Sequence, residues 1–228
     1  MITGTLINTV TVTVGSLTGA AAGERLPEKT QKSVLHVLGL FTLFIGVQNA
    51  LETKNILIPL GALLVGTIVG EAIGIQQFLD NVGVWFEKRF KFIRSRGNVS
   101  RGFLVASLVF CVGPLTILGC IEDGLKGDYH LLAIKSTLDL FSSMALASAL
   151  GIGVFLAVFT ILIYQGSLSL FAFALSEVIT DPMMAEMTSA GGIILLGNGL
   201  LLLEIKELPI ANYLPALVLA PVIVAVVG

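Results

Sequence analysis

Charged residues are scarce in this chain of 228 residues, since Lys, Arg, Asp and Glu together make up only 12% of it. Soluble domains carry about 25% of these residues. Hydrophobic residues account for 55% of the chain, and its mean hydropathy is +0.97. This balance excludes a soluble globular domain. The net charge of −2, with no basic stripe outside one loop, also gives no support to a nucleic-acid partner.

Residues that commonly carry catalysis are equally sparse. Cys111 and Cys120 lie in one apolar segment, where about 13 Å of helix would keep them from pairing. His36 and His130 lie near the expected helix ends and form no paired-histidine motif. A phosphate loop, a dinucleotide fingerprint and a cluster of metal-ligating cysteines are all missing from the sequence. We therefore expect neither an enzyme nor a bound cofactor.

The apolar residues fall into runs of about 20, which is the length needed to cross a bilayer. They predict an all-α polytopic membrane protein with about eight spans. A merged or broken helix around Gly151-Ile152-Gly153 would reduce these to seven, and Gly113-Pro114 predicts a kink in the fourth span. The expected spans are 2–22, 33–52, 56–76, 102–121, 130–150, 152–174, 187–204 and 209–227.

The distribution of Lys and Arg predicts the orientation of the spans. Basic residues gather in the loops after the first and third spans, whereas the loop after the sixth span is acidic (Glu177, Asp181 and Glu186). This bias places the first and third loops in the cytoplasm and both termini outside.

A short internal repeat of three helices occurs near each end of the chain. Its matches, in the same order in both copies, are Gly15-Ser16-Leu17 with Gly166-Ser167-Leu168, Leu51-Glu52-Thr53-Lys54 with Leu203-Glu204-Ile205-Lys206, and Asn55 to Leu63 with Ala211 to Leu217. Because two spans separate the copies, the repeats would be inverted, as in many secondary transporters. The predicted organisation is a single transmembrane domain (1–228) with repeats at 2–76 and 152–227, an amphipathic segment at 77–98 and an inserted helix pair at 102–150.

Two further patterns concern surfaces. Apolar residues recur at helical spacing from Gln77 to Ile93, opposed by charges, and predict an interfacial helix on the cytoplasmic leaflet with Trp85 at headgroup depth. Its basic residues Lys88, Arg89 and Lys91 would anchor it to anionic lipid, with regulation as the alternative. Rows of small residues predict close helix packing within the fold or in a homo-oligomer. These rows are Gly15, Gly19 and Gly23 in the first span, and Gly66, Gly70 and Gly74 in the third.

Asp139 is the most informative polar residue, because it lies near the middle of the fifth span. An ionised side chain there costs about 2.5–3.5 kcal/mol on insertion scales. Lys135, Ser142 and Ser143 share its helix face. One interpretation is a Lys135–Asp139 pair that neutralises itself, with the serines bonded to their own helix. The other is a cation, proton or solute site, and the sequence leaves both open.

Other polar residues extend this candidate site. Asn8 in the first span and Asn198 in the seventh lie deep enough to contribute to a site at the repeat interface. Glu71 in the third span either reaches the interface or takes part in gating or a proton relay. Glu122 and Asp123 close the fourth span, either as a solvated loop or as a mouth that concentrates cations.

Several stretches resemble one family over essentially the whole chain. They are Gly4 to Asn8, Gly70-Glu71, Phe110 to Asp128, Lys135 to Asp139 and Ala211 to Ala216. The sequence is similar in these stretches to the YdfK/YqgA-like bacterial membrane proteins, grouped as the domain of unknown function 554. The resemblance implies a prokaryotic plasma-membrane protein without an established activity.

Together these patterns favour a small secondary transporter for a solute or cation, with a midplane site formed by Asn8, Asp139, Ser142, Ser143 and Asn198, and with Lys135 tuning Asp139. A homo-oligomeric ion channel is one alternative. A membrane scaffold or lipid-binding protein that uses the basic amphipathic helix is another.

Overall fold

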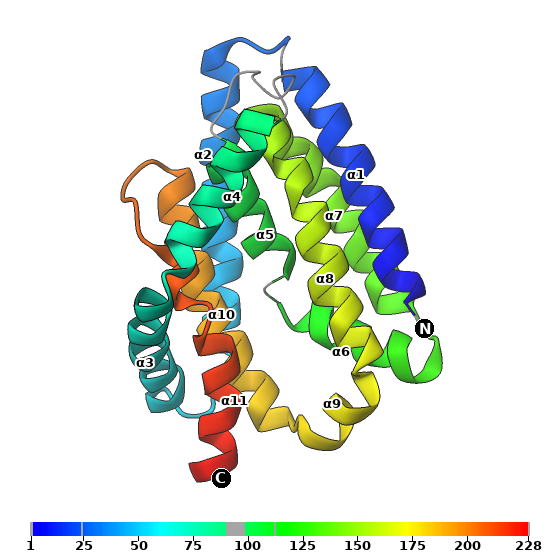
Figure 1. Ribbon diagram of the computed structural model, residues 1–228, viewed down its shortest axis with the longest axis vertical. Coiled ribbons are helices and arrows are strands. Elements are labelled where there is room, and N and C mark those ends of the chain that lie inside the picture. Colours follow the sequence, from blue (N-terminus) through cyan, green and yellow to red (C-terminus); the bar gives the residue numbers. More distant parts are fainter. Residues whose placement is uncertain (1, 24, 90–98, 112, 228) are drawn as a thin grey trace. The chain divides into compact units, whose positions relative to one another are not determined.

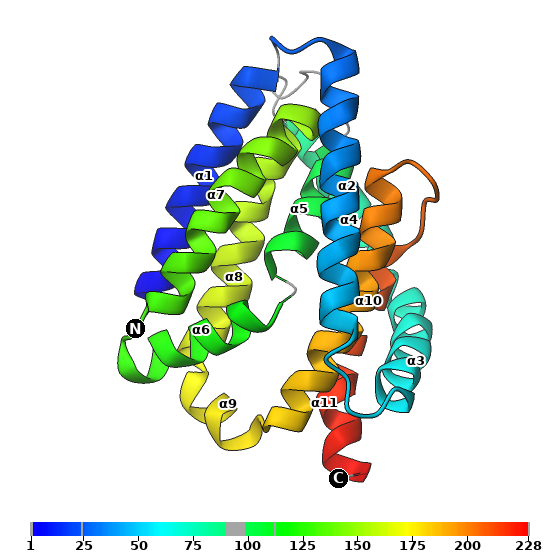
Figure 2. The same cartoon turned by 180° about the vertical axis from the view of Figure 1, so that it is seen from behind.

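The chain folds into helices in every regular element that the structure describes, in agreement with the predicted all-α class. The computed structural model describes residues 2–23, 25–89, 99–111 and 113–227, with the backbone alone at 83, 86–89 and 114. Two compact units can be separated, and Figures 1 and 2 show the helices of each. Unit 1 comprises Met1–Leu35 and Asn81–Glu177, and unit 2 comprises His36–Asp80 and Val178–Gly228.

Unit 1 is organised around a parallel pair of long helices. Its main elements are α1 (Thr3–Gly23), α5 (Val99–Cys111), α6 (Pro114–Lys126), α7 (His130–Leu150), the 3-10 helix η2 (Gly151–Leu156), α8 (Ala157–Leu170) and α9 (Ala172–Val178). A Cβ atom built on Gly15 would meet the Leu140 carbonyl oxygen, and one on Gly23 would meet that of Ser148. The residue numbers of the contacting positions increase together along the two helices, so α1 and α7 are parallel. Their backbones touch along a row of glycines.

Helix α8 runs in the opposite direction to α1 and α7. In one continuous helix Asp139 and Gln165 would be about 39 Å apart. Instead, Asn8 Nδ2 lies 2.9 Å from Asp139 Oδ2 and 3.3 Å from Gln165 Oε1. The chain therefore reverses between them. The reversal begins at Gly151, whose φ of 77° is a conformation that favours glycine, and it continues through η2.

The predicted interruption in the fourth span is present. Helix α5 ends at Cys111 and α6 begins at Pro114, with an angle of 63° between their axes. Proline has no amide hydrogen and cannot continue the hydrogen-bond ladder of the preceding helix, but it is well suited to the first turn of a new one.

Unit 2 consists of two antiparallel helix pairs. Its elements are most of α2 (Glu28–Ala50), α3 (Leu57–Ile73), the start of α4 (Ile75–Arg89), α10 (Asp181–Leu202), the 3-10 helix η3 (Ile210–Tyr213) and α11 (Ala216–Val227). Added Cβ atoms on Gly66 and Gly70 would meet Ala216 and Asn212, which pairs α3 with the η3–α11 segment.

The second pair of unit 2 is α2 with α10. A Cβ on Gly39 would meet Leu203, and one on Gly192 would meet Ala50. The contact positions rise along one helix as they fall along the other, so the two helices are antiparallel. The glycines of α1, and Gly66 and Gly70 of α3, are thus covered within the chain, whereas Gly74 ends α3 in a left-handed conformation. A second copy of the protein would have to use a surface other than these covered glycines.

The amphipathic segment is helical as far as it is described. Helix α4 spans Ile75–Arg89, and Phe78, Val84 and Trp85 are exposed on it. The side chains of Lys88 and Arg89, and residue Lys91 altogether, lie outside the described residues. Whether α4 lies at a membrane surface stays a prediction.

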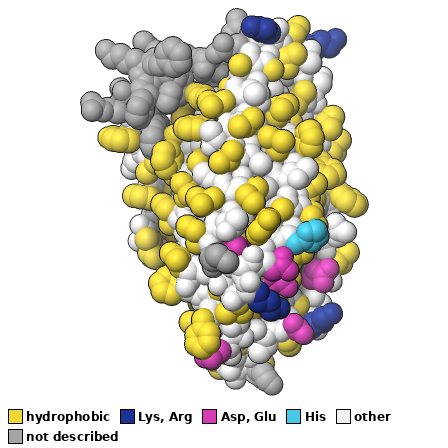
Figure 3. Space-filling view, turned by 90° about the vertical axis from the view of Figure 1, so that its right-hand side faces the viewer, with side chains coloured by type: hydrophobic (Ala, Val, Ile, Leu, Met, Phe, Trp, Pro, Cys, Tyr) yellow, Lys and Arg dark blue, Asp and Glu magenta, His cyan; other side chains and the backbone are white. Residues whose placement is uncertain are grey.

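Five helical stretches of the described chain are long and apolar enough to cross a membrane, or up to seven if each of two bent pairs counts as one span. This number is below the predicted eight, partly because it treats His130–Leu170 as one stretch of 41 residues. Apolar side chains on α1 and α7 face outward, among them Leu6, Val10 and Phe141. Figure 3 shows such a face, with apolar side chains between charged groups at its two ends.

Candidate functional site

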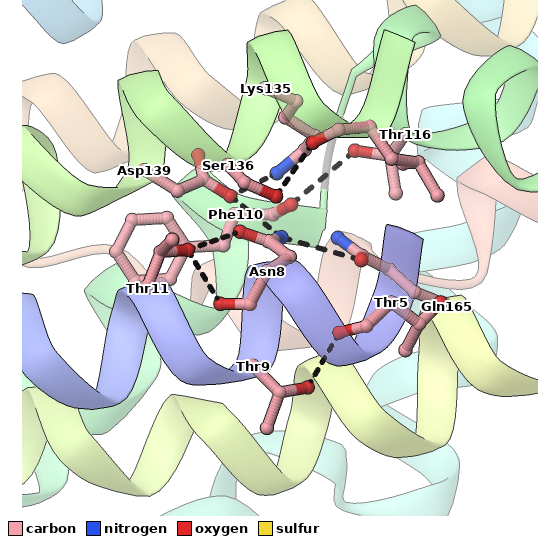
Figure 4. A network of polar contacts seen from close by, with 11 residues as sticks. Thr5, Asn8, Thr9, Thr11, Phe110, Thr116, Lys135, Ser136, Asp139 and Gln165 are labelled. Atoms are coloured by element: carbon pink, nitrogen blue, oxygen red, sulfur yellow. Dashed lines mark hydrogen bonds and ion pairs between the residues drawn. The ribbon is translucent and has the colours of Figure 1, made fainter. Parts of the chain in front are cut away.

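Four buried polar side chains in unit 1 form one connected network, which Figure 4 shows from close by. Asn8 on α1 donates a hydrogen bond from Nδ2 to Asp139 Oδ2 on α7, at 2.9 Å. The same nitrogen donates to Gln165 Oε1 on α8, at 3.3 Å. Lys135 forms an ion pair with the same oxygen of Asp139. None of the four residues is more than 7% exposed. The network therefore joins three helices, with α7 linked to α1 through the Asp139 carboxylate and α1 linked to α8 through the Asn8 amide.

The ion pair within this network follows from the local sequence. Lys135 and Asp139 are four residues apart in α7, which brings their side chains together on one helix face. The structure thus contains the self-neutralising pair that was one of the two interpretations. The second interpretation was a cation, proton or solute site, which needs polar groups from more than one helix. The structure shows such a contact, because the Asp139 carboxylate accepts a hydrogen bond from Asn8 on α1.

Ser142, Ser143 and Asn198, which were predicted to belong to the site, are not members of this four-residue network. Ser143 is buried where α1 crosses α7, beside Gly15, and its hydroxyl donates to the Leu140 carbonyl oxygen at 2.9 Å. Its hydrogen bond is therefore made with its own helix. Ser142 is half-buried. Asn198 belongs to unit 2, where it is buried in α10.

Gln165 is the member of the network that the sequence prediction missed. It is completely buried in α8. A signal was available, because an uncharged amide in an otherwise apolar span needs a hydrogen-bond partner within the protein. The sequence alone did not reveal which helix supplies that partner.

The break between α5 and α6 lies close to the network. Both helices contact α7, and Figure 4 shows Phe110 and Thr116 near Lys135. The interruption deprives the last carbonyl groups of α5 of helical partners. The Thr116 hydroxyl donates to one of them, that of Phe110, at 3.4 Å. Interrupted helices of this kind occur in membrane proteins where the backbone is enclosed by protein or lines a cavity.

The three residues proposed for gating or a proton relay lie in different surroundings. Asp123 is fully buried, and its carboxylate accepts a hydrogen bond from Gly4 N at 2.9 Å. Because α1 begins at Thr3, this carboxylate caps an amide that has no partner within the helix and interacts favourably with the helix dipole. Glu122 is half-buried and Glu71 is exposed on α3.

A third buried carboxylate, Glu186, is found in unit 2. Glu186 was expected in the loop after the sixth span, but it lies in the second turn of α10 and is 1% exposed. It accepts hydrogen bonds from the Thr53 hydroxyl at 2.6 Å and from the amides of Lys54 and Asn55 at 2.7 and 2.9 Å. Glu186 therefore holds the segment that leads into α3. The prediction that Glu186 lies in a loop was wrong, because α10 begins at Asp181 and already includes this residue.

No group of three or more His, Cys, Asp or Glu side chains that could hold a metal ion occurs in the described residues. Among the four residues of the Asp139 network, Asp139 is the one carboxylate, and it already has Lys135 as its counter-ion. Chemically, the site is a neutral, buried ion pair surrounded by amides.

Comparisons with known proteins agree with the predicted resemblance. The sequence pattern of the family described as "Protein of unknown function (DUF554)" matches residues 3–225. The chain is 32% identical over 228 residues to the uncharacterized membrane protein YdfK of Bacillus subtilis, covering 98% of this chain and 96% of that one. It is 31% identical over 223 residues to the uncharacterized protein YqgA of Escherichia coli, covering 96% and 95%. No solved structure matches it. The protein is thus a helical membrane protein, and it belongs to the DUF554 family.

Proposed function

We propose that this protein is a small secondary transporter, which moves a small solute or cation across the membrane by alternating access. The observation that carries the proposal is the buried Asp139 network. Ionised side chains within a bilayer are costly, and they commonly mark substrate or ion pathways. An ion pair that only stabilises the fold can often be replaced by apolar packing without loss. Here the carboxylate also bonds to Asn8, and through it to a third helix.

The arrangement of the repeats supports the same function. Each helix of the first predicted repeat is antiparallel to its counterpart in the second. In unit 1 this holds for α1 and α8, and in unit 2 for α2 with α10 and α3 with the η3–α11 segment. Opposed directions are expected of inverted repeats, whose relative movement exposes a shared site to each side of the membrane in turn.

A ligand acts on this network by exchanging hydrogen-bond partners at Asp139. Asp139 Oδ2 receives bonds from both Lys135 and Asn8. A ligand that replaces Asn8 breaks a hydrogen bond between α1 and α7, and one that replaces Lys135 changes the counter-ion of the carboxylate to which Asn8 bonds. Helix α8 is affected as well, because Asn8 also donates a hydrogen bond to Gln165 on that helix. One exchange of partners at Asp139 therefore reaches three helices, which is the coupling that alternating access needs.

In the proposed topology the protein lies in a prokaryotic plasma membrane with both termini outside, as the basic loops predict. It acts there as a homo-oligomer driven by a proton or sodium gradient. Labelling of a single cysteine, introduced at either end of a cysteine-free variant, by an impermeant reagent on intact cells tests the topology.

Flux into proteoliposomes tests the function. Purified protein is reconstituted with an imposed proton or sodium gradient and offered labelled cations, amino acids and organic acids. We expect saturable uptake that Asp139→Asn abolishes and that Glu177→Gln, an exposed change outside the network, leaves unaltered. Absence of any Asp139-dependent flux would contradict transport. Flux that does not saturate, with single-channel currents, would instead identify a channel. Unchanged cellular function in Asp139→Asn, with loss on neutralising Lys88, Arg89 and Lys91, would identify a lipid-binding scaffold.

A further inference from the structure

Two buried polar atoms, one within the Asp139 network and one next to it, have no hydrogen-bond partner in the described part of the chain. They are Gln165 Nε2 and Thr5 Oγ1. Gln165 is completely buried and Thr5 is 1% exposed. Thr5 lies one helical turn before Asn8 on α1, so both side chains lie on one face of that helix. In Figure 4 these two residues lie next to Asn8.

The orientation of the Gln165 amide follows from the ion pair. The Asp139 carboxylate accepts hydrogen bonds, so Asn8 must present its NH₂ group to it. The same NH₂ group meets Gln165, which must therefore turn its oxygen toward Asn8. The Gln165 NH₂ group is left pointing away from Asn8 with two unused hydrogens. A flipped amide would bring two NH₂ groups face to face, so it does not remove the unpaired donor.

Buried donors without acceptors are rare in folded proteins, because they lose their bonds to water and gain nothing in return. Beside a charged network they indicate a group that completes the site. That group carries acceptor oxygens, since Gln165 offers only N–H donors on this side and the Lys135 ammonium has further hydrogens beyond the one directed at Asp139.

The charge of the site further restricts the chemical class of the ligand. Lys135 and Asp139 neutralise each other while almost completely buried. A lone cation bound at Asp139 would leave the Lys135 ammonium without its counter-ion, and a lone anion bound at Lys135 would do the same to Asp139. Either change leaves an uncompensated charge in a buried setting. A molecule that carries one charge of each sign can exchange with both partners and keep the site neutral.

We propose that the ligand of this site is a small zwitterion of the amino-acid class. Its carboxylate accepts hydrogen bonds from Gln165 Nε2, the Thr5 hydroxyl and the Lys135 ammonium. Its ammonium group takes the place of Lys135 at the Asp139 carboxylate. The inference rests on the proposed transport function and names its substrate class. Thr5 and Gln165, the second of which the sequence prediction missed, become binding residues.

Direct binding to the full-length protein in lipid nanodiscs tests the proposal. Each of the twenty common amino acids is titrated by calorimetry, and acetate, methylammonium, sodium chloride and manganese chloride serve as probes with one kind of charge. We expect at least one amino acid to bind saturably and at least about tenfold more tightly than every single-charge probe. Loss of one hydrogen bond to a charged group corresponds to roughly tenfold weaker binding or more, and we expect this of Gln165→Met and Thr5→Val.

Two variants serve as controls for misfolding. Thr5→Val keeps the shape of the side chain and removes a hydroxyl that has no partner, so the fold should tolerate it. Thr160→Val removes a hydroxyl from the same helix as Gln165, one that is already paired with Ser107 at 3.0 Å, and should leave amino-acid affinity unchanged.

Failure of every amino acid to bind would overturn the inference, as would tighter binding of a single-charge probe or unchanged affinity in Thr5→Val and Gln165→Met. Asp139-dependent flux of a cation alone would also overturn the substrate class while leaving the transporter in place. Amino-acid binding without any flux would uphold the ligand and refute transport.

Discussion

The substitution Gly19→Ala tests the packing that holds α1 against α7. A Cβ at Gly19 would lie 2.1 Å from the carbonyl oxygen of Met144 and 2.8 Å from that residue's Cα. Those atoms belong to the backbone and cannot rotate away, so the helices would have to separate. Gly166 on α8, which the predicted repeat aligns with Gly15, has nothing within 4 Å of the corresponding position. Gly166→Ala is therefore a matched control in a second helix.

The magnitude follows from the difference between these variants. Replacing Gly by Ala in a helix gains about 0.8–1 kcal/mol of helix propensity at either position, so this gain cancels. Overpacking costs about 1–3 kcal/mol, and it applies only to Gly19. The expected difference in unfolding free energy is therefore about 1–3 kcal/mol, or several degrees in Tm for a chain of this size.

The assay can use the two native cysteines. Cys111 and Cys120 are both buried, so a thiol-reactive fluorophore added to detergent-solubilised protein reports their exposure on heating. We expect Gly19→Ala to unfold several degrees below Gly166→Ala. Equal midpoints for the two variants, or a higher one for Gly19→Ala, would refute the close contact between α1 and α7.

Three further predictions can be tested in the same assay. Glu186→Gln should lose at least about 1.5 kcal/mol, because its carboxylate accepts three hydrogen bonds, whereas the exposed Glu177→Gln should stay within about 0.5 kcal/mol of the parent; equal effects would contradict the buried position of Glu186. Asp123→Ala should lose about 1–2 kcal/mol through the missing cap on α1, and an unchanged midpoint would argue against that cap. Lys135→Met should lose about 3–5 kcal/mol of unfolding free energy, because it leaves the Asp139 carboxylate without its counter-ion. Adding Asp139→Leu should recover much of this loss. A double variant less stable than the single one would show that the carboxylate stabilises the fold without its lysine.

Local features of this protein could be predicted because their causes lie within one or two helical turns. The apolar runs and the shortage of charge determine that the chain is a helical membrane protein. Lys135 and Asp139 meet because residues four apart share a helix face. The interruption at Gly113-Pro114 follows from the missing amide hydrogen of proline.

The partners of these features were decided by tertiary structure. Asn8 meets Gln165 across 157 residues of sequence, and Gly4 meets Asp123 across 119. Apolar spans resemble one another, so hydropathy alone does not say which of them touch. Close backbone approach at glycines such as Gly15 and Gly70 selects the neighbours. The burial of Glu186 could not be predicted for the same reason, because the amides that bind it belong to a loop more than 130 residues earlier in the chain. Composition and local spacing thus determined the class of this protein and its central ion pair, whereas the helix contacts decided which polar groups surround that pair.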